Sequence, residues 1–257
     1  ARGTFYCFGC HESGDIFSLV MKKEGVDFSS AVEMLAKKAG VELEEVSDTY
    51  NKDEAKKRRE EKENLYDLYS RLSNTFHYLL LNSKEGEKAR EYLKKRNVSS
   101  EMIELFHLGY APSNKDWLYS FLSGKGYSPT FLNQSGLFSQ KSDKWPLFRS
   151  RLMFPIRDRQ GRTIAFSGRD LTGDERAPKY INSPETTIYQ KKENYFGLYE
   201  AKNTIAEGKI GPILCEGNFD VVAMHQAGYT SAIASLGTSF TNEQCANMKK
   251  WYPNNQV

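Results

Sequence analysis

The spacing of hydrophobic residues changes from helical in the N-terminal part of the chain to alternating in its centre. Apolar positions that recur every three or four residues predict amphipathic helices. Glycines directly after such runs, as at Gly25 and Gly40, predict helix ends. The helices predicted in this way span residues 15–24, 29–39, 64 to about 96, 100–106, 117–124 and 130–135.

Residues 51–62 interrupt this pattern because nearly all of them are charged. A solvated linker and an exposed helix are both compatible with such a composition. The segment contains no glycine or proline, so we expect a charged helical tether rather than a flexible one.

The central part of the chain predicts a β-hairpin. Residues 149–156 alternate between apolar and other side chains, which is typical of a strand, and the strands are expected to begin here. Residues 162–171 are the expected returning strand. The three residues between the strands, 159–161, fit a turn with Gly161 in the left-handed conformation and a bulge beside it.

A regular ladder from this turn pairs Arg151 with Arg169 and Met153 with Ser167. Arg149, Arg151 and Arg169 would then converge on one face, where a phosphate chain could lie. Like charges directly across a ladder are destabilising, so such an arrangement needs compensation. The alternative is a set of solvated arginines that pair with nearby acidic side chains.

The C-terminal part alternates between short strands and helices, which predicts a right-handed parallel α/β unit. The predicted segments are a strand at 213–215, a helix at 221–227, a strand at 230–236 and a helix at 241–251. A turn follows at 253–256, and Val257 would be the first residue of a third strand.

Glu216 directly follows the first of these C-terminal strands. Ligands of open parallel sheets bind at the carboxyl ends of the strands, so this carboxylate is a candidate for divalent-metal and phosphate chemistry. Gly217 and Gly237 would permit close approach of a phosphate or a backbone. Alternatively, Glu216 is a helix-terminal acid favoured by the helix dipole, and Asp220 simply caps the helix.

Cys7 and Cys10 have the Cys-x-x-Cys spacing of a zinc knuckle. A redox-active pair is the main alternative, but that motif needs a buried strand before it and a helix after it. Two thiolates do not complete a tetrahedral zinc site, and His11 is badly placed to do so.

Composition limits the remaining possibilities. The 257 residues are 39% hydrophobic and 27% charged, which is ordinary for a soluble protein of one to three domains. The net charge of +3 is small, so a nucleic-acid surface would depend on local clusters of basic residues. No apolar run could span a membrane, and four cysteines in a chain of this length favour a reduced, cytoplasmic compartment.

Several groups of residues resemble motifs of the bacterial DNA primases of the DnaG type. The N-terminal group resembles the second half of the primase zinc ribbon, the central groups resemble the polymerase core, and the C-terminal groups resemble the opening of a Toprim domain. In chain order, these residues are Tyr6-Cys7-Phe8-Gly9-Cys10, Phe148 to Ile156, Gly168-Arg169, Pro178 to Thr186, Glu216-Gly217-Asn218-Phe219-Asp220 and Leu236-Gly237-Thr238. They occur in the family order and extend over essentially the whole chain.

The resemblance implies a mixed α+β and α/β fold, in which a helical and β-rich polymerase subdomain precedes the start of a parallel-sheet Toprim domain. The implied divisions are a partial zinc ribbon with helices at residues 1–45, a charged linker at 46–63, the N-terminal polymerase subdomain at 64–205 and the first part of the Toprim domain at 206–257.

By the same resemblance, the activity would be metal-dependent synthesis of short RNA primers from nucleoside triphosphates on a single-stranded DNA template. Glu216 would be catalytic and, with Asp220, would bind Mg²⁺ or Mn²⁺. Gly217, Gly237 and Thr238 would lie near the nucleotide phosphates.

The resemblance also assigns binding residues outside the acidic site. Cys7 and Cys10 would supply half of a Zn²⁺ site. The residues that would bind the template strand and the nascent RNA are Arg149, Arg151, Arg169, Lys179 and Lys191. Lys191 is followed by Lys192 and Glu193 where the family has a glycine and a basic residue, which leaves the local backbone shape open.

The first pair of zinc ligands, the Asp-x-Asp acids and the helicase-binding C-terminal domain of the family lie outside the sequence. Because these metal ligands are not in the sequence, we expect the 257-residue chain alone to bind little zinc and to make no primer. We also expect it to be a monomer. A Toprim nuclease or topoisomerase is one alternative, although such enzymes lack the central motifs. A non-catalytic module that binds single-stranded DNA is another.

Overall fold

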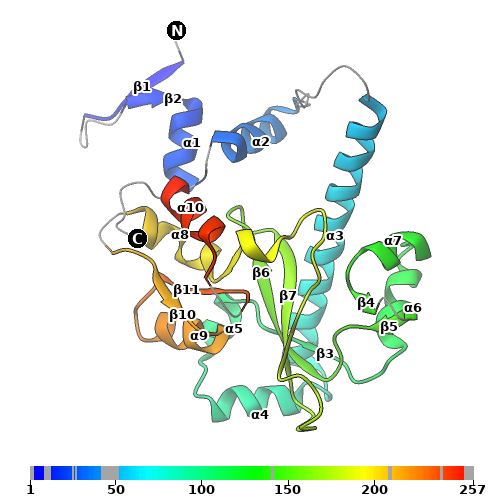
Figure 1. Cartoon of the computed structure of the whole chain (residues 1–257). Coiled ribbons are helices and arrows are strands. Elements are labelled where there is room, and N and C mark those ends of the chain that lie inside the picture. The colour runs from blue at the N-terminus through cyan, green and yellow to red at the C-terminus, as the bar shows by residue number, and fades with distance from the viewer. Residues whose placement is uncertain are drawn as a thin grey trace.

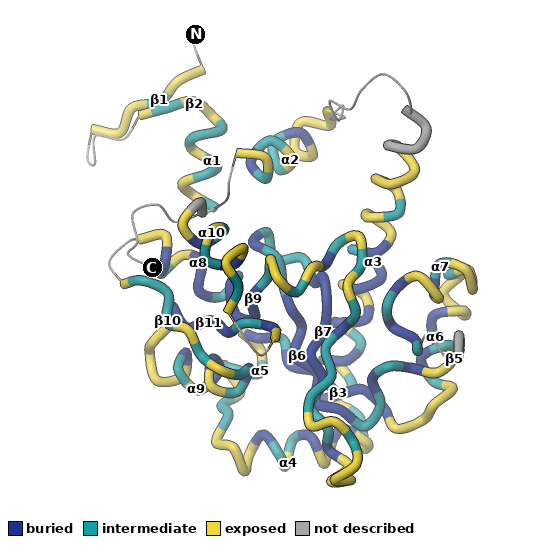
Figure 2. Tube along the Cα trace, viewed as in Figure 1, coloured by how far each residue is buried: buried dark blue, intermediate teal, exposed yellow. Residues whose placement is uncertain are grey.

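An antiparallel sheet with the strand order β3-β6-β7-β8 lies at the centre of the molecule (Figure 1). Its strands are β3 (Gly109–Ala111), β6 (Arg151–Arg157), β7 (Thr163–Asp170) and β8 (Tyr180–Asn182). Both central strands are buried over most of their length (Figure 2). The computed structural model describes residues 3–8, 13–24, 26, 28–41, 52–139, 142–207, 210–237 and 240–251.

A long helix, α3 (Lys52–Asn82), packs against one face of this sheet. Tyr69 and Phe76 contact Phe166 of β7, with ring centroids 5.4 and 5.5 Å apart. Gly109 of β3 permits the close approach, because a Cβ there would lie 2.6 Å from the Cβ of Phe76. The helix begins within the charged segment, so the prediction that this segment is helical is confirmed.

The predicted single helix from 64 to about 96 is wrong, because α3 ends at Asn82 and α4 (Glu87–Lys95) follows as a separate helix. Ser83 closes the first helix, since its hydroxyl donates to the carbonyl oxygen of Leu79 and accepts from the N–H of Gly86. These bonds satisfy backbone groups that a helix end leaves unpaired. The hydrophobic spacing alone does not reveal this break.

A small subdomain continues the core on the α3 side of the sheet. It contains α6 (Trp117–Gly124), α7 (Pro129–Gln134), β4 (Phe138–Ser139) and β5 (Ser142–Pro146). Because β3, β4 and β5 precede residue 149, the expectation that strands begin there is wrong. These strands have two to five residues each, too few for a recognisable alternation.

The hairpin of β6 and β7 has the predicted turn but a different register. Gly161 is left-handed, with φ +84°, and its N–H donates to the carbonyl oxygen of Asp158. A bulge between Ile156 and Arg157 then adds one residue to β7 and shifts every later pair. The resulting pairs are Arg151–Asp170, Leu152–Arg169, Met153–Gly168 and Phe154–Ser167.

The C-terminal part packs against the other face of the central sheet. Strand β10 (Ile213–Cys215) is parallel to β11 (Ala232–Ser235), which confirms the predicted parallel pair. A strand absent from the prediction, β9 (Tyr195–Phe196), joins the far edge of β11 in antiparallel orientation. The surrounding helices are α5 (Ser100–Leu105), α8 (Leu198–Ala206), α9 (Asn218–Gln226) and α10 (Asn242–Trp251). The turn expected at 253–256 and the strand expected to begin at Val257 lie outside the described residues.

The N-terminal segment forms a short hairpin and two helices at the top of Figure 1. These elements are β1 (Thr4–Tyr6), β2 (Ser13–Asp15), α1 (Ile16–Glu24) and α2 (Phe28–Ala39). Asp15 caps α1 by accepting from the N–H and hydroxyl of Ser18, both at 2.8 Å. In the part of the chain that the structure describes, no helix is long and apolar enough to cross a membrane.

Candidate nucleic-acid and metal site

Glu216 lies at the carboxyl edge of the parallel strand pair. Strand β10 ends at Cys215, which pairs with Ala234 of β11. Continuation of this register puts Glu216 beside Ser235, and its side chain is exposed. The strand and the parallel pairing predicted from sequence thus bring this carboxylate to the open edge of the sheet, where ligands of α/β proteins bind.

Asp220 faces the same edge from the first turn of α9. A Cβ built on Gly217 would lie 3.3 Å from its Oδ2 atom. The Asp220 charge adds to burial in raising the pKa of the Cys215 thiol, which places that charge beside the end of β10. Within the described residues, no group of three or more acidic, histidine or cysteine side chains could hold a metal ion.

The resemblance also places Gly217, Gly237 and Thr238 near the nucleotide phosphates, and the structural surroundings of these residues differ. Gly217 is extended, with φ −148°, so its backbone conformation does not require glycine. A Cβ on Gly237 would meet no atom within 4 Å, so the space in front of this residue is open. Thr238 lies outside the described residues.

Asn182 joins the central sheet to this acidic edge. Its side-chain amide donates to the carbonyl oxygen of Leu236 at 2.8 Å, directly after β11. Asn182 belongs to β8, whose first residue is Tyr180, the neighbour of Arg169 in β7. The hydrogen bond therefore connects the strand that follows Lys179 with the edge that carries Glu216.

Arg151 and Arg169 do not converge on one face as the predicted ladder implied. They are not cross-strand neighbours in the observed register, and alternation along the strands puts them on opposite faces of the sheet. The expected repulsion between them is absent, because Asp170 takes the place of Arg169 opposite Arg151.

The Arg151 side chain is buried on the α3 side, with only 5% of its surface exposed. Its Nη1 atom donates to the carbonyl oxygens of Gly168 and Pro178, at 2.9 and 3.0 Å. Burial lowers the pKa of its guanidinium, and the charge of Asp170, 4.0 Å away, opposes this shift. These contacts connect β6 with β7 and with the segment that leads into β8.

The other predicted basic residues reach solvent to different degrees. Lys179 is exposed, and Lys191 is half-buried at the start of a 3₁₀ turn, Lys191–Glu193. This turn is the local backbone shape that the sequence left open. Arg149 is half-buried and stacks on the exposed ring of Trp145, with its guanidinium carbon 4.2 Å from the ring centroid. Cations over aromatic faces are common in surfaces that bind single strands.

A cluster of aromatic and basic residues that the sequence did not indicate surrounds Arg169. Its guanidinium lies 5.5 Å from the ring centroid of Tyr92 in α4 and 5.2 Å from that of Tyr180. Arg96, directly after α4, contacts the same Tyr92 ring and also Phe219 of α9. The Lys94-Lys95-Arg96 run was a visible basic signal, but nothing in the sequence pointed to its neighbours.

Of the two predicted zinc ligands, the structure describes only Cys7. Cys7 is exposed and follows β1, whereas Cys10 lies outside the described residues. Strand β1 has three residues and is mostly exposed. This setting differs from the buried strand that the redox alternative requires, so the zinc interpretation fits better.

Three family models match successive parts of the chain. Residues 1–51 match the CHC2 zinc finger, residues 76–202 match the N-terminal domain of the DNA primase catalytic core, and residues 212–256 match the Toprim domain. These matches support binding of zinc and of divalent metal in general. The curated DNA primase of Treponema pallidum is 40% identical over 97% of the chain, and that of Enterococcus faecalis is 38% identical over 97%.

The chain belongs to the DnaG-type DNA primase family. It spans 40% of the length of each of these two curated primases. Its mixed helix-and-sheet fold is also that of solved primases. The zinc-binding and RNA polymerase domains of Aquifex aeolicus primase match 97% of the chain, and 58% of that chain is covered, at 32% identity and a TM-score of 0.66.

Two further primase structures were solved with DNA. A DnaG primase catalytic domain bound to single-stranded DNA matches 75% of the chain, with 59% of that chain covered, 39% identity and a TM-score of 0.67. The RNA polymerase domain of Mycobacterium tuberculosis primase, in complex with double-stranded DNA that has a 6-nucleotide overhang, matches 74%, with 59% covered, 35% identity and a TM-score of 0.69.

Proposed function

We propose that the whole protein is a DNA-directed RNA polymerase that makes short RNA primers on single-stranded DNA. The observation that carries this proposal is a connection between two groups of residues. The strand surface consists of Arg149, Arg169, Lys179 and Lys191, which would bind the template strand, and the acidic edge consists of Glu216 and Asp220. The Asn182–Leu236 hydrogen bond joins the sheet that carries Arg169 to the strand edge that carries Glu216. A template held along β7 and β8 would thus lie next to acids suited to nucleotidyl transfer.

Glu216 and Asp220 are the residues that would hold Mg²⁺ or Mn²⁺. Both side chains are exposed, and carboxylate oxygens are the donors that these hard cations prefer. The open space in front of Gly237 leaves room for a nucleotide phosphate there, with Thr238 next in sequence. When bound, the metal would neutralise charge on the triphosphate oxygens during displacement. Two carboxylates supply only part of a coordination sphere, so further ligands would come from the rest of the whole protein.

The strand surface would bind the template DNA and the nascent RNA through phosphate contacts. Arg149, Arg169, Lys179 and Lys191 all reach solvent, and each can donate to phosphate oxygens. Arg151 remains a predicted strand-binding residue, although its present contacts are with the protein backbone. The related DnaG catalytic domain solved with single-stranded DNA supports DNA of this kind as the ligand.

The zinc ribbon would bind Zn²⁺ through Cys7 and Cys10 and orient the template. The same proposal includes domain divisions at residues 45, 63 and 205. It also includes a cytoplasmic location and a replicative helicase as partner. Elemental analysis of the whole protein tests the metal assignment. Cys7→Ser should lower the zinc content well below one ion per chain, whereas Cys245→Ser, in α10, should leave it unchanged.

The proposed activity can be tested on the whole protein with single-stranded template, ribonucleoside triphosphates and Mg²⁺. Short template-dependent RNA is the expected product. Cleavage or relaxation of duplex DNA without RNA synthesis would instead support a nuclease or topoisomerase. Binding of the template without any reaction would support a binding module.

A further inference from the structure

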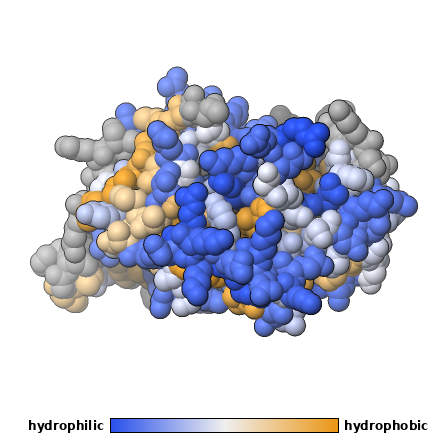
Figure 3. Space-filling model, turned by 90° about the horizontal axis from the view of Figure 1, so that it is seen from below, coloured by the Kyte–Doolittle hydropathy of each residue, from blue (hydrophilic) through white to orange (hydrophobic). Residues whose placement is uncertain are grey.

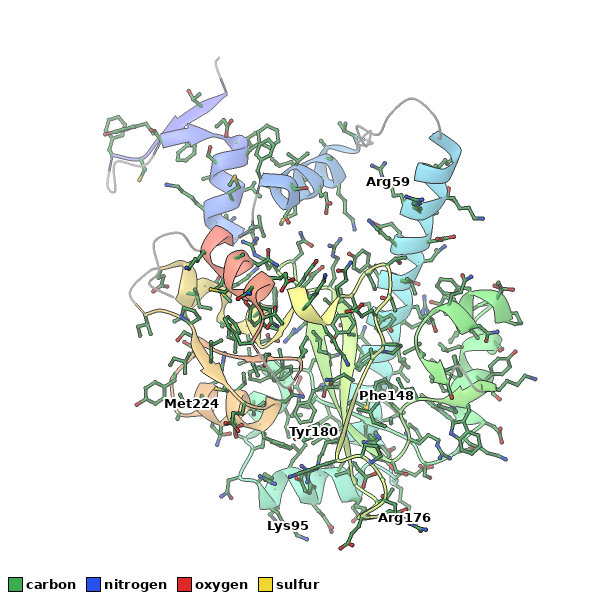
Figure 4. All side chains as sticks on the ribbon, viewed as in Figure 1. Arg59, Lys95, Phe148, Arg176, Tyr180 and Met224 are labelled. Carbon is green, nitrogen blue, oxygen red and sulfur yellow. The ribbon has the colours of Figure 1, made fainter. Side chains whose placement is uncertain are left out.

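The beginning of α10 holds the turn that carries Lys191. Helix α10, drawn in red, lies beside the yellow 3₁₀ turn in Figures 1 and 4. The amide nitrogen of Gln244 donates to the carbonyl oxygens of Asn194 and Lys191, at 2.9 and 3.5 Å. The hydroxyl of Thr241 donates to the carbonyl oxygen of Lys192 at 3.1 Å. Two side chains of one helix end thus bind three backbone oxygens of the turn and its end.

The same two side chains also cap α10. The hydroxyl oxygen of Thr241 accepts from the N–H of Gln244 at 3.1 Å, and the amide oxygen of Gln244 accepts from the N–H of Thr241 at 3.0 Å. This reciprocal pair is a capping box, in which glutamate serves as well as glutamine because only an oxygen is needed. Glutamate has no N–H to donate. The amide of Gln244 is therefore required by the turn and not by the helix.

Burial makes this choice of side chain stringent. Only 1% of the surface of Gln244 is exposed, and its amide oxygen and nitrogen both have backbone partners. A carboxylate at this position would place an oxygen against the carbonyl oxygens of Asn194 and Lys191. Buried acceptors that face each other without a donor cost free energy, so the turn would be displaced from α10.

The turn is also connected to the acidic edge of the sheet. Strand β9 begins directly after Asn194, and its first residue, Tyr195, pairs with Ser235 of β11, beside which Glu216 lies. The ring of Tyr195 is buried, and its hydroxyl donates to the carbonyl oxygen of Gln244. The position of the turn relative to the acids is therefore fixed by β9 on one side and by α10 on the other.

This fixed backbone is what distinguishes Lys191 from other lysines. The face that includes α4, seen from below in Figure 3, is mainly hydrophilic, and Lys95 is exposed at that end of the molecule in Figure 4. Exposed charge alone therefore does not single out Lys191. Its own N–H donates to the carboxylate of Glu185 at 3.2 Å, which adds a further contact of the turn. Because the turn is already ordered, Lys191 would lose little backbone entropy when it binds a phosphate.

We infer that Gln244 is a positioning residue for strand binding. Its amide holds the turn so that the ammonium group of Lys191 reaches a phosphate of the strand beside the acidic edge. This inference rests on the proposed function, which supplies the strand and the role of Lys191. A residue that only stabilised α10 would leave the contribution of Lys191 to DNA binding unchanged.

A double-mutant cycle in the whole protein tests this coupling. The variants are Gln244→Glu, Lys191→Ala and the combination of the two. Binding of a labelled oligothymidylate is measured over a range of salt concentrations. The control is Asn242→Asp, which adds the same negative charge at an exposed position in the first turn of α10.

We expect Lys191→Ala to weaken binding about threefold to tenfold and to lower the salt slope by about 0.7, the value for one single-strand phosphate contact. Gln244→Glu should weaken binding about threefold and lower the slope in the same direction, because it removes the donor and keeps the cap. In the Lys191→Ala background, Gln244→Glu should change affinity less than about 1.5-fold, since coupled residues are not additive.

Asn242→Asp should change affinity less than about twofold, and by the same factor in both backgrounds, because a charge exposed to solvent is screened. Equal effects of Gln244→Glu and Asn242→Asp would overturn the inference, as would additive effects of Gln244→Glu and Lys191→Ala. If Gln244→Glu fails to fold, Thr241→Asp decides, because aspartate keeps the cap and has no hydroxyl to donate to Lys192. Unchanged DNA affinity in that variant would contradict the inference.

The cycle also separates this inference from the proposed function. If Lys191→Ala weakens DNA binding and Gln244→Glu does not, only the positioning role of Gln244 fails. Normal DNA binding by Lys191→Ala would contradict both the positioning role and the place of Lys191 in the strand surface. Primer synthesis by the unmodified whole protein is measured alongside, and its absence would contradict the proposed function itself.

Discussion

The side-chain amide of Asn182 donates to the carbonyl oxygen of Leu236 at 2.8 Å, across the boundary between the central sheet and the parallel strand pair. The two residues are far apart in sequence, yet each lies next to a group proposed to act in the reaction. Asn182 lies in β8, the strand that directly follows Lys179, and Leu236 follows β11, the strand beside Glu216. The relative position of strand surface and acids therefore depends on a specific polar contact as well as on packing.

Replacement of Asn182 by alanine should lower the free energy of unfolding by about 1 kcal/mol, since it removes one hydrogen bond and leaves a carbonyl oxygen unpaired. Urea unfolding of the 257-residue chain measures this change. Asn203→Ala, at an exposed position of α8, is the control and should shift stability by less than about 0.5 kcal/mol. Equal effects would show that the Asn182 bond contributes nothing specific.

Arg151→Ala should mainly reduce stability, because the side chain is buried and donates to two backbone carbonyl oxygens. Loss of a buried, paired charge predicts a decrease of about 3 kcal/mol in the free energy of unfolding. Arg176→Ala is the matched control, since that side chain is 93% exposed and a surface ion pair with Asp174 contributes little. Normal stability together with lost DNA binding would instead make Arg151 a direct strand-binding residue.

Acid should destabilise the chain in part through His107. Burial and the neighbouring His77 and Arg157 lower its pKa from 6.5 to about 4. The unfolded chain therefore takes up this proton more readily, so stability is complete above about pH 6.5 and falls as the pH decreases toward about 4.

His107→Asn should reduce the loss of stability between about pH 7.5 and about pH 5, which urea midpoints at the two values measure. Asparagine suits the site because the backbone there is left-handed, with φ +51°. The effect should be partial, because burial also lowers the pKa of His225. An unchanged difference between the two midpoints would contradict the assignment.

Much of the fold could be predicted because it depends on local signals. The left-handed Gly161 specified the hairpin turn, and short apolar runs separated by a helix specified the parallel pair of β10 and β11. The register of the hairpin could not be predicted, because the bulge beside Arg157 has no sequence signature and changes every later pair. The break after Asn82 was missed because it depends on hydrogen bonds of Ser83 rather than on hydrophobic spacing.

The sequence likewise predicted only part of the candidate site. Glu216 could be identified because an acid directly after a parallel strand has one expected location, the open edge of the sheet. The pairing of Arg96 with Tyr92 is local, but its contact with Phe219 depends on how α4 packs against α9. Such a tertiary contact leaves no periodic pattern, so only the structure brings these residues together with Arg169.

The central claim is that the acidic edge of the sheet performs nucleotidyl transfer on a strand bound beside it. Glu216→Gln in the whole protein tests this most directly, with primer yield and template affinity measured on the same preparation. Removal of a metal-binding charge should harm the transition state more than it harms binding of DNA. Glu243→Gln, an exposed acid in the first turn of α10, is the control for a simple helix-terminal charge. We predict that Glu216→Gln abolishes primer synthesis with nearly unchanged template affinity and that Glu243→Gln retains activity; near-normal primer yield from Glu216→Gln would contradict the account.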